Sequence, residues 1–243
     1  MKNYLILCLI LLGACGPVYE RGNGNLSTVE KEVSSFSEVE VDGQFQIILD
    51  EGKEKVTVLT DENLHKYINI FVEGDVLYIE STENIKSEEG IKIYINYEHL
   101  ESLQLKGAPQ LSAEQTIKTK ELNIDVDGAA LVELDLKVRD LEISISGAGL
   151  IELSGEATDL ILEMGGTGNL NAYKLMTENA NIELSGVGAA QVNVSKRLIG
   201  SVSGVGSIKY KGNPKAVDTE INGLGQISPS SDKEEDSNIE IDL

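Results

Sequence analysis

Seven glycines spaced almost evenly between residues 107 and 223 constrain the fold of this chain more than any other feature. They are Gly107, Gly128, Gly147, Gly166, Gly186, Gly204 and Gly223, separated by 21, 19, 19, 20, 18 and 19 residues. Self-similarity at a period near twenty is typical of repeat arrays, in which each repeat is one supersecondary unit stacked on the next. The sequence therefore predicts a stack of about seven similar turns.

A strand pattern precedes each of these glycines, and a second apolar run follows it. Before Gly147, the apolar residues Leu141, Ile143 and Ile145 alternate with polar ones, and the same alternation occurs at 122–126, 160–164, 180–184, 198–202 and 217–221. Alternation with a period of two places one set of side chains inside and the other in water. The second set of inward residues is expected to be Leu131 and Leu134, Leu150 and Leu153, Leu170 and Ala172, Val192 and Val194, and Ile208 and Tyr210.

The nearly constant spacing would place each strand beside its equivalent in the next repeat, parallel and in register. We therefore predict an all-β fold, a parallel β-solenoid of about 19–20 residues per rung over residues 101–228, rising roughly 4.8 Å per rung. A doubly wound α/β fold is excluded because no segment between the strands is long enough for a crossover helix. An antiparallel β-sandwich stays open, since hairpins also recur at short spacing.

Residues 34–100 are rich in strand patterns but poorly periodic, and we expect them to form an irregular N-terminal β cap. The segment 38–49, which turns at Asp42-Gly43, resembles a first, divergent rung. Residues 68–72 and 76–79 are predicted to form a hairpin that turns at Gly74. Further short strands are expected at 56–59 and 91–97.

The turn glycines have two expected roles, to supply positive φ and to let adjacent backbones stack closely. The residues before them are Lys106, Asp127, Ser146, Gly165, Ser185, Ser203 and Asn222. Small polar side chains at these positions could cap the free N–H groups of the turns. Stacking would also line them into one polar edge, which is either turn chemistry alone or a ridge that contacts glycans or partner surfaces.

The N-terminus has the pattern of an export signal. Lys2 precedes a short apolar run, and Leu12-Gly13-Ala14-Cys15 is similar to the lipobox of bacterial lipoproteins. We expect residues 1–14 to be a lipoprotein signal peptide, Cys15 to carry the lipid, and residues 15–33 to be a flexible tether. Residues 229–243 are expected to form an acidic tail, in which 238–243 could add a terminal strand.

Composition limits the partners and the chemistry. The formal charge is −21, from 20 basic against 41 acidic residues, which disfavours nucleic acid because binding it requires clustered positive charge. The two histidines, His65 and His99, lie in the irregular N-terminal region and are expected to be surface or cap residues. No catalytic, cofactor or metal site is recognisable, and whether the acidic edges bind calcium stays open.

The lipobox, the strand Phe36–Gly43 and the recurrent Ser-Gly-Ala/Val-Gly turns resemble one family of bacterial proteins, the putative auto-transporter adhesin, head GIN domain family. The resemblance covers residues 34–228. It implies a right-handed parallel β-helix in an envelope protein, and adhesion is suggested by the family name. The family supplies no established catalytic or binding residues, and this chain shows no autotransporter barrel, whose anchoring role a lipid on Cys15 would replace.

These expectations lead to a functional hypothesis. The chain would be a lipid-anchored, non-enzymatic β-solenoid of the bacterial cell envelope, at the outer membrane, with an adhesin-like role toward a glycan or protein surface. The alternatives are a glycan-binding or polysaccharide-processing envelope module and a purely structural envelope component. Because Tyr67, Tyr78, Tyr94 and Tyr97 lie outside the regular repeats, any sugar-binding platform would be expected among them.

Overall fold

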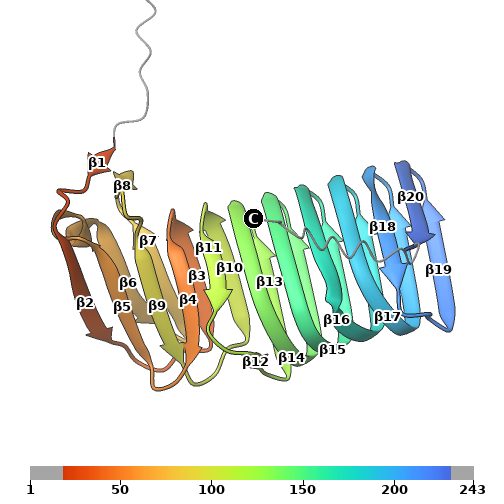
Figure 1. Cartoon of the computed structure of the whole chain (residues 1–243), viewed down its shortest axis with the longest axis horizontal. Helices are drawn as coiled ribbons and strands as arrows, with labels where there is room; N and C mark the ends of the chain where they lie inside the picture. The colour runs from red at the N-terminus through yellow and green to blue at the C-terminus, as the bar shows by residue number, and fades with distance from the viewer. Residues whose placement is uncertain (1–18, 231–243) are drawn as a thin grey trace, which may run out of the picture.

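A computed structural model describes residues 19–230, and they form one elongated β-solenoid of about seven turns (Figure 1). Eighteen strands make one continuous sheet that winds around the long axis, and β1 and β8 make a separate two-stranded sheet. The predicted parallel β-solenoid is confirmed. Within residues 19–230, no helix is long and apolar enough to cross a membrane.

In the regular rungs, one strand segment precedes the glycine turn and another follows it. The strands are β10 (Ser102–Gly107), β11 (Gln110–Ala113), β12 (Ile117–Lys118), β13 (Glu121–Val126), β14 (Ala129–Ile145), β15 (Ala148–Met164), β16 (Thr167–Leu184), β17 (Val187–Val202), β18 (Val205–Lys211), β19 (Ala216–Ile221) and β20 (Leu224–Pro229). The long strands β14 to β17 bend halfway, so each serves both sides of the solenoid. We call the side formed by segments before the turns the pre-turn side, and the other the post-turn side.

The N-terminal region both continues the solenoid and caps it. The strands β3 (Glu38–Gly43) and β4 (Gln46–Glu51) form the predicted first rung, parallel to β10 and β11. On their other edges, β7 (Val76–Ser81) and β9 (Lys92–Tyr97) add a further parallel layer. The antiparallel strands β5 (Lys55–Asp61) and β6 (Ile68–Glu73) then close the stack. The predicted hairpin is confirmed as β6–β7, in which Gly74 has a φ of 63°.

The segment expected as a tether differs from that expectation where the structure describes it. Residues 20–21 form β1 (Glu20–Arg21), which pairs with β8 (Ile85–Lys86), and β2 (Leu26–Glu32) pairs antiparallel with the whole of β5. The physical reason is that β5 would otherwise be an unpaired edge strand. The 3₁₀-helix η1 (Glu62–Tyr67), which the sequence did not predict, packs the buried Leu64 under this end. Residues 1–18, with the predicted signal and Cys15, and residues 231–243 lie outside the described part of the chain.

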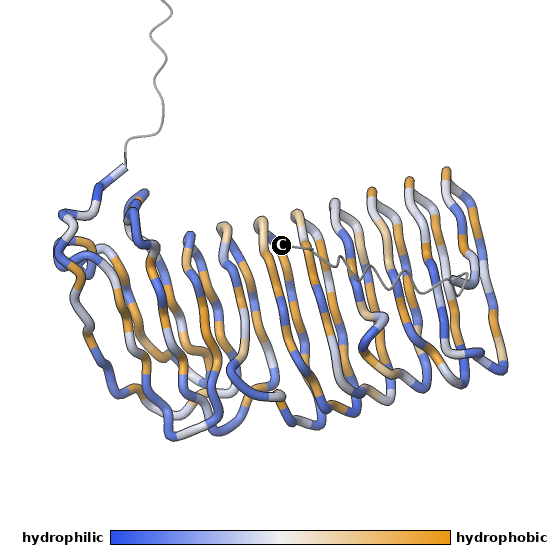
Figure 2. Tube along the Cα trace, viewed as in Figure 1, coloured by the Kyte–Doolittle hydropathy of each residue, from blue (hydrophilic) through white to orange (hydrophobic). Residues whose placement is uncertain are grey.

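The core between the two sides is built mainly from Ile, Leu and Val, and Figure 2 shows the hydropathy alternating along the strands. The inward positions predicted before the turns are buried except in the last rung. After the turns, the predictions for Leu131 and Leu150 are wrong, because these side chains are 50% and 45% exposed. The buried series is instead Ala130, Val132 and Leu134, with the equivalent residues of the next rung. Leu131 and Leu134 are three residues apart, so they cannot share one face of a strand.

The turn glycines are needed for close approach. A Cβ built on Gly147 would lie 2.1 Å from the carbonyl oxygen of Gly128, and one on Gly166 would lie 2.1 Å from that of Gly147. Of the seven, only Gly107 has a positive φ, of 71°, so the expected role in supplying positive φ is wrong for the others. Contact between stacked backbones therefore selects glycine here.

Backbone carbonyls, and not the small polar side chains, satisfy the N–H groups of the turns. In one rung, the N–H groups of Ser146 and Gly147 both donate to the Val126 carbonyl, each at 3.0 Å. The N–H of Ala148 donates to the Gly128 carbonyl at 2.7 Å, and equivalent bonds recur in the later turns. The preceding residues do stack into the predicted polar edge, where the Ser146 hydroxyl donates to Asp127.

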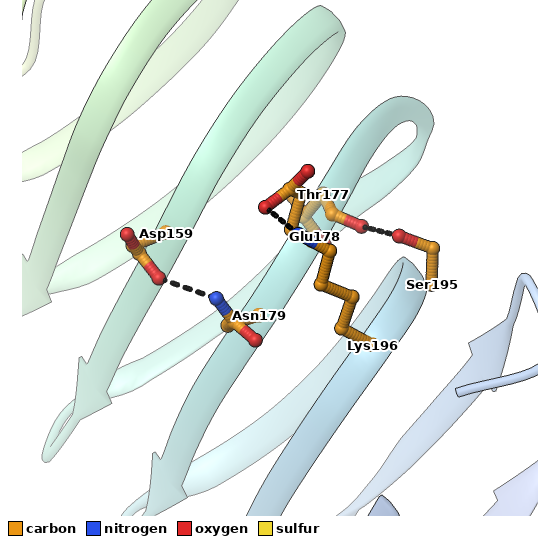
Figure 3. Close-up of polar contacts among 6 residues, drawn as sticks. All are labelled: Asp159, Thr177, Glu178, Asn179, Ser195 and Lys196. Carbon is orange, nitrogen blue, oxygen red and sulfur yellow. Dashed lines mark hydrogen bonds and ion pairs between the residues drawn. The ribbon is translucent and has the colours of Figure 1, made fainter. Parts of the chain in front are cut away.

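Irregular spacing of the glycines is absorbed at the bends, on the edge away from the turns. Between β15 and β16 the register shifts by one residue after Glu152, where β16 bulges, which accounts for the 20-residue repeat. Between β16 and β17 two shifts together remove two residues and give the 18-residue repeat. Side chains bind the rungs together at these bends (Figure 3): Asn179 donates to Asp159 at 2.8 Å, and the Ser195 hydroxyl donates to the Thr177 carbonyl at 3.0 Å. The turns thus stay in register.

The two ends of the solenoid differ. At the N-terminal end, β2 covers the stack with the charged residues Glu30, Lys31 and Glu32. At the other end, every residue of β19 is exposed, including Val217 at 44% and Ile221 at 46%. These two were predicted to be inward. They do continue the inward columns, but no further rung covers them among the described residues.

Candidate binding groove

An open hollow of about 580 Å³ lies on the post-turn side and crosses five neighbouring strands, β4, β11, β14, β15 and β16. Two columns of outward side chains line it, one residue from each strand in each column. The first column is Gln46, Gln110, Leu131, Leu150 and Asn169, and the second is Ile48, Ser112, Glu133, Glu152 and Asn171. We call this hollow the groove. Its volume falls within the range common for ligand sites.

Two adjacent leucines occupy the centre of the groove. Leu131 and Leu150 pair across β14 and β15, and about half of each side chain is in contact with solvent. Neither contributes to the core, because the neighbouring inward residues Val132 and Ile151 fill it. Adjacent exposed apolar side chains rimmed by polar residues are a common mark of an interaction site. Surface leucines in a hollow therefore indicate contact with a ligand or partner.

Three polar side chains in the groove are unused by the fold. Within residues 19–230, the side chains of Gln110, Glu133 and Asn169 make no hydrogen bond or ion pair. The next outward positions on two of the groove strands differ. On β4, the Asp50 carboxylate accepts hydrogen bonds from Asn96 at 3.2 Å and from Gln115 at 3.0 Å. Asp135 likewise accepts a bond from the Ser154 hydroxyl, at 3.0 Å. The groove thus presents free amide donors and acceptors to a ligand.

The electrostatic character of the groove is mildly negative. Glu133 and Glu152, neighbours on β14 and β15, are the only charged residues that line it. Lys174, in the bulged part of β16, lies 3.6 Å from Glu152, and both side chains are more than half exposed. An ion pair this exposed contributes little energy. An anionic ligand would meet two carboxylates here and no unpaired lining cation.

The four tyrosines expected to form a sugar platform do not converge. Tyr78 stacks on Phe71 on the pre-turn side, with ring centroids 5.0 Å apart. Tyr97 is buried, and burial, followed by the charges of Glu51 and Asp50, raises its pKa to about 12. Tyr67 is partly buried beside Lys66. Only Tyr94 lies near the groove, because it pairs with Ile48 and faces the same side.

The remaining candidate groups lie away from the groove. His65 is partly buried and within 2.9 Å of the Ser27 hydroxyl, and His99 is exposed. Asp125 lies on the pre-turn side, where burial, with a further contribution from Asp127, raises its pKa above the usual value. Within residues 19–230, no group of three or more His, Cys, Asp or Glu residues is placed to hold a metal ion.

Geometry and residue types suit the groove to hydrogen bonding and apolar contact. Its lining holds no histidine, cysteine, lysine or arginine. The sequence prediction missed the groove because it assigned Leu131 and Leu150 to the core. A strict alternation count would have placed both leucines outside, because over 130–134 it makes Ala130, Val132 and Leu134 inward, and over 149–153 it makes Gly149, Ile151 and Leu153 inward.

Comparison with solved structures finds the same fold in bacterial proteins. A putative adhesin from Bacteroides fragilis is similar with a TM-score of 0.83 and 24% identity, covering 87% of this chain and 100% of that one. A putative adhesin from Parabacteroides distasonis gives 0.68 at 23% identity, covering 88% and 100%. A putative lipid binding protein from the same species gives 0.64 at 24% identity, also covering 88% and 100%. At these identities the similarity establishes the fold.

No curated protein matches the sequence. Residues 35–214 match a family model described as putative auto-transporter adhesin, head GIN domain. This range is most of the chain and includes the first rung, the groove and the stacked glycine turns down to β18. The chain therefore belongs to the putative auto-transporter adhesin, head GIN domain family.

Proposed function

We propose that this protein is an exported, lipid-anchored β-solenoid of the bacterial cell envelope that binds a surface without catalysis, and that the groove is its contact site. The family and the adhesin names of its structural neighbours support an adhesin-like role. The observation that carries the site is the pair of exposed leucines in a hollow lined by unused amide groups.

Cys15 supplies the anchor in this proposal, and the membrane is the outer one. A lipoprotein carries several acyl chains, which hold a protein on a membrane far more firmly than one chain does. The folded domain follows the anchor closely in sequence, since β1 begins at Glu20 and β2, the first strand of the solenoid sheet, begins at Leu26. The groove would then be carried on a rigid body tied to the envelope.

A surface-binding assay with a matched pair of variants tests the site. The test variant is Leu131→Ser with Leu150→Ser. The control is Ile161→Ser with Val187→Ser, which removes exposed aliphatic side chains of similar size outside the groove. Purified protein is applied to immobilised bacterial envelopes and to extracellular matrix proteins, and the bound fraction is measured with and without calcium.

We expect saturable binding that the groove variant loses and the control variant keeps. Both variants change exposed residues, so their circular dichroism and melting temperatures should match the parent protein. Binding that survives the groove variant would reject the groove as the site. No binding by the folded parent protein to any of these surfaces would reject the adhesin-like role.

Polysaccharide processing is the second candidate, because Glu133 and Glu152 are neighbouring carboxylates in the same hollow. Glycoside hydrolysis commonly uses two carboxyl groups placed on either side of the scissile bond. Release of reducing ends from a polysaccharide, abolished by Glu133→Gln and by Glu152→Gln, would favour this function over binding alone.

A further inference from the structure

We propose that the groove binds an extended, uncharged polysaccharide that runs along the solenoid axis with about one sugar unit over each rung. This inference rests on the proposed function and names its ligand class. It follows from the spacing of the side chains, the character of the groove floor, its charge and the position of Tyr94.

The first argument is the match between two repeats. Residues in one column of the groove lie on successive parallel strands, so they recur roughly every 4.8 Å. That spacing is close to the length of one pyranose unit in an extended polysaccharide. An extended peptide advances only about 3.3 Å per residue, so its side chains would fall out of step with the columns within two rungs. A glycan can therefore repeat the same contact on each strand, and a peptide cannot.

The second argument is that the groove floor offers side chains and no free backbone. Each of its five strands is paired on both edges, for example β4 with β9 and β11, and β15 with β14 and β16. Binding of a peptide by strand addition needs an open sheet edge, which is missing here. Recognition must come from the amides of Gln110 and Asn169, the Glu133 carboxylate and the leucines. These groups suit a ligand with many hydroxyls and apolar ring faces.

The third argument concerns charge. Glu133 and Glu152 are the only charged groups in the lining, and Lys174 is already within 3.6 Å of Glu152. Uronic acids, sulfated sugars and phosphate-bearing polymers would place like charges beside these carboxylates, which is unfavourable. An uncharged glycan instead gives each carboxylate hydroxyl donors, and hydrogen bonds to a charged acceptor are the stronger kind.

The fourth argument is the aromatic ring at one end of the groove. Tyr94 of β9 pairs with Ile48 of β4, so it continues the column that holds Glu133 and Glu152 by one further strand. Its side chain faces outward and is partly exposed. A tyrosine combines an apolar ring with a polar hydroxyl, which suits it to stack on a sugar ring. The path of the ligand would thus extend from β16 to β9.

Calorimetric titration with neutral oligosaccharides of two to eight units tests the proposal. The probes are glucose, mannose and xylose oligomers, and oligogalacturonate serves as the acidic comparison. We expect at least one neutral series to bind with an affinity that rises with length up to about five or six units and then levels off. Leu131→Ser with Leu150→Ser should weaken binding at least tenfold and Tyr94→Ala severalfold, while Ile161→Ser with Val187→Ser leaves it unchanged.

Three results would overturn the inference. They are the absence of binding by every neutral series, tighter binding of oligogalacturonate, and an affinity that does not depend on length or on the groove leucines. Periodate oxidation of the envelopes used in the surface assay destroys sugar rings and leaves protein surfaces. It therefore distinguishes a wrong ligand class from a wrong binding site. Binding that survives oxidation and still requires Leu131 and Leu150 would keep the groove as the site but show that its ligand is not a glycan.

Discussion

Replacement of one stacked glycine by alanine should show whether close backbone contact holds the rungs together. The test substitution is Gly166→Ala. A Cβ on Gly166 would lie 2.1 Å from the Gly147 carbonyl oxygen and 2.4 Å from that of Ser146. Gly165→Ala is a control one residue away, because the nearest atom to its Cβ would be the Ser185 hydroxyl oxygen at 3.8 Å. Neither glycine has a φ in the positive region.

The expected cost of Gly166→Ala can be worked from these contacts. The carbonyl of Gly147 must move away by about 1 Å to reach an ordinary contact distance. Separation of the two turns stretches two bonds of 2.9 Å between them, from Thr167 N–H to the Gly147 carbonyl and from Gly166 N–H to the Ile145 carbonyl. Overpacking costs about 1–3 kcal/mol, and two weakened hydrogen bonds add about 1–3 kcal/mol. We expect a loss of about 2–6 kcal/mol, or on the order of 10 °C in melting temperature.

The control variant should not lose stability. Gly165→Ala places a methyl group at ordinary contact distance, 3.8 Å from the Ser185 hydroxyl oxygen. It also reduces the freedom of the unfolded chain, so the stability of this variant should be unchanged or slightly higher. Thermal unfolding followed by circular dichroism measures the difference. Hydrogen exchange shows whether the loss of stability arises at the turns. The amides to follow are those of Thr167 and Val187, which donate to the neighbouring turn carbonyls. Equal stability of the two variants would refute the argument that steric contact selects glycine at these turns.

Three further predictions concern the exposed end, the buried tyrosine and the anchor. Val202→Lys should cost about 3–5 kcal/mol because it buries an unpaired charge, while Ile221→Lys, in the same column but 46% exposed, should change the melting temperature little; similar losses would contradict the exposure of β19. Folding raises the pKa of Tyr97 to about 12, so the unfolded state loses the phenol proton first and stability should fall as pH rises from 10 to 12. Urea unfolding should show a smaller fall for Tyr97→Phe, and an equal fall in both proteins would contradict a role for Tyr97. Cys15→Ser should abolish labelling with radioactive palmitate and release the protein from the membrane fraction, and retained labelling would exclude Cys15 as the lipid site.

Periodic features were predictable from the sequence, and local compensations were not. The spacing of the turn glycines predicts the parallel stack, and the alternation before each turn predicts the inward residues down to Val202. Pairing of β2 with β5 could not be predicted, because β2 is mostly polar. It is held by its hydrogen bonds to the edge of β5, which would otherwise be unpaired. The positions of the register shifts at the bends could not be predicted either. The sequence shows repeats of 20 and 18 residues, but only the structure shows that the shifts fall away from the turns.

The groove could have been located from the sequence by the same reasoning that corrects the assignment of Leu131 and Leu150 to the core. In an alternating strand, apolar residues that break the parity must face outward. Leu131 breaks it against Ala130 and Val132, and Leu150 breaks it against Ile151 and Leu153. In a solenoid, two such residues one repeat apart also become neighbours, as Leu131 and Leu150 are across β14 and β15. Out-of-parity leucines one repeat apart therefore indicate an exposed apolar ladder, and this reasoning connects the amino-acid sequence to the proposed binding surface.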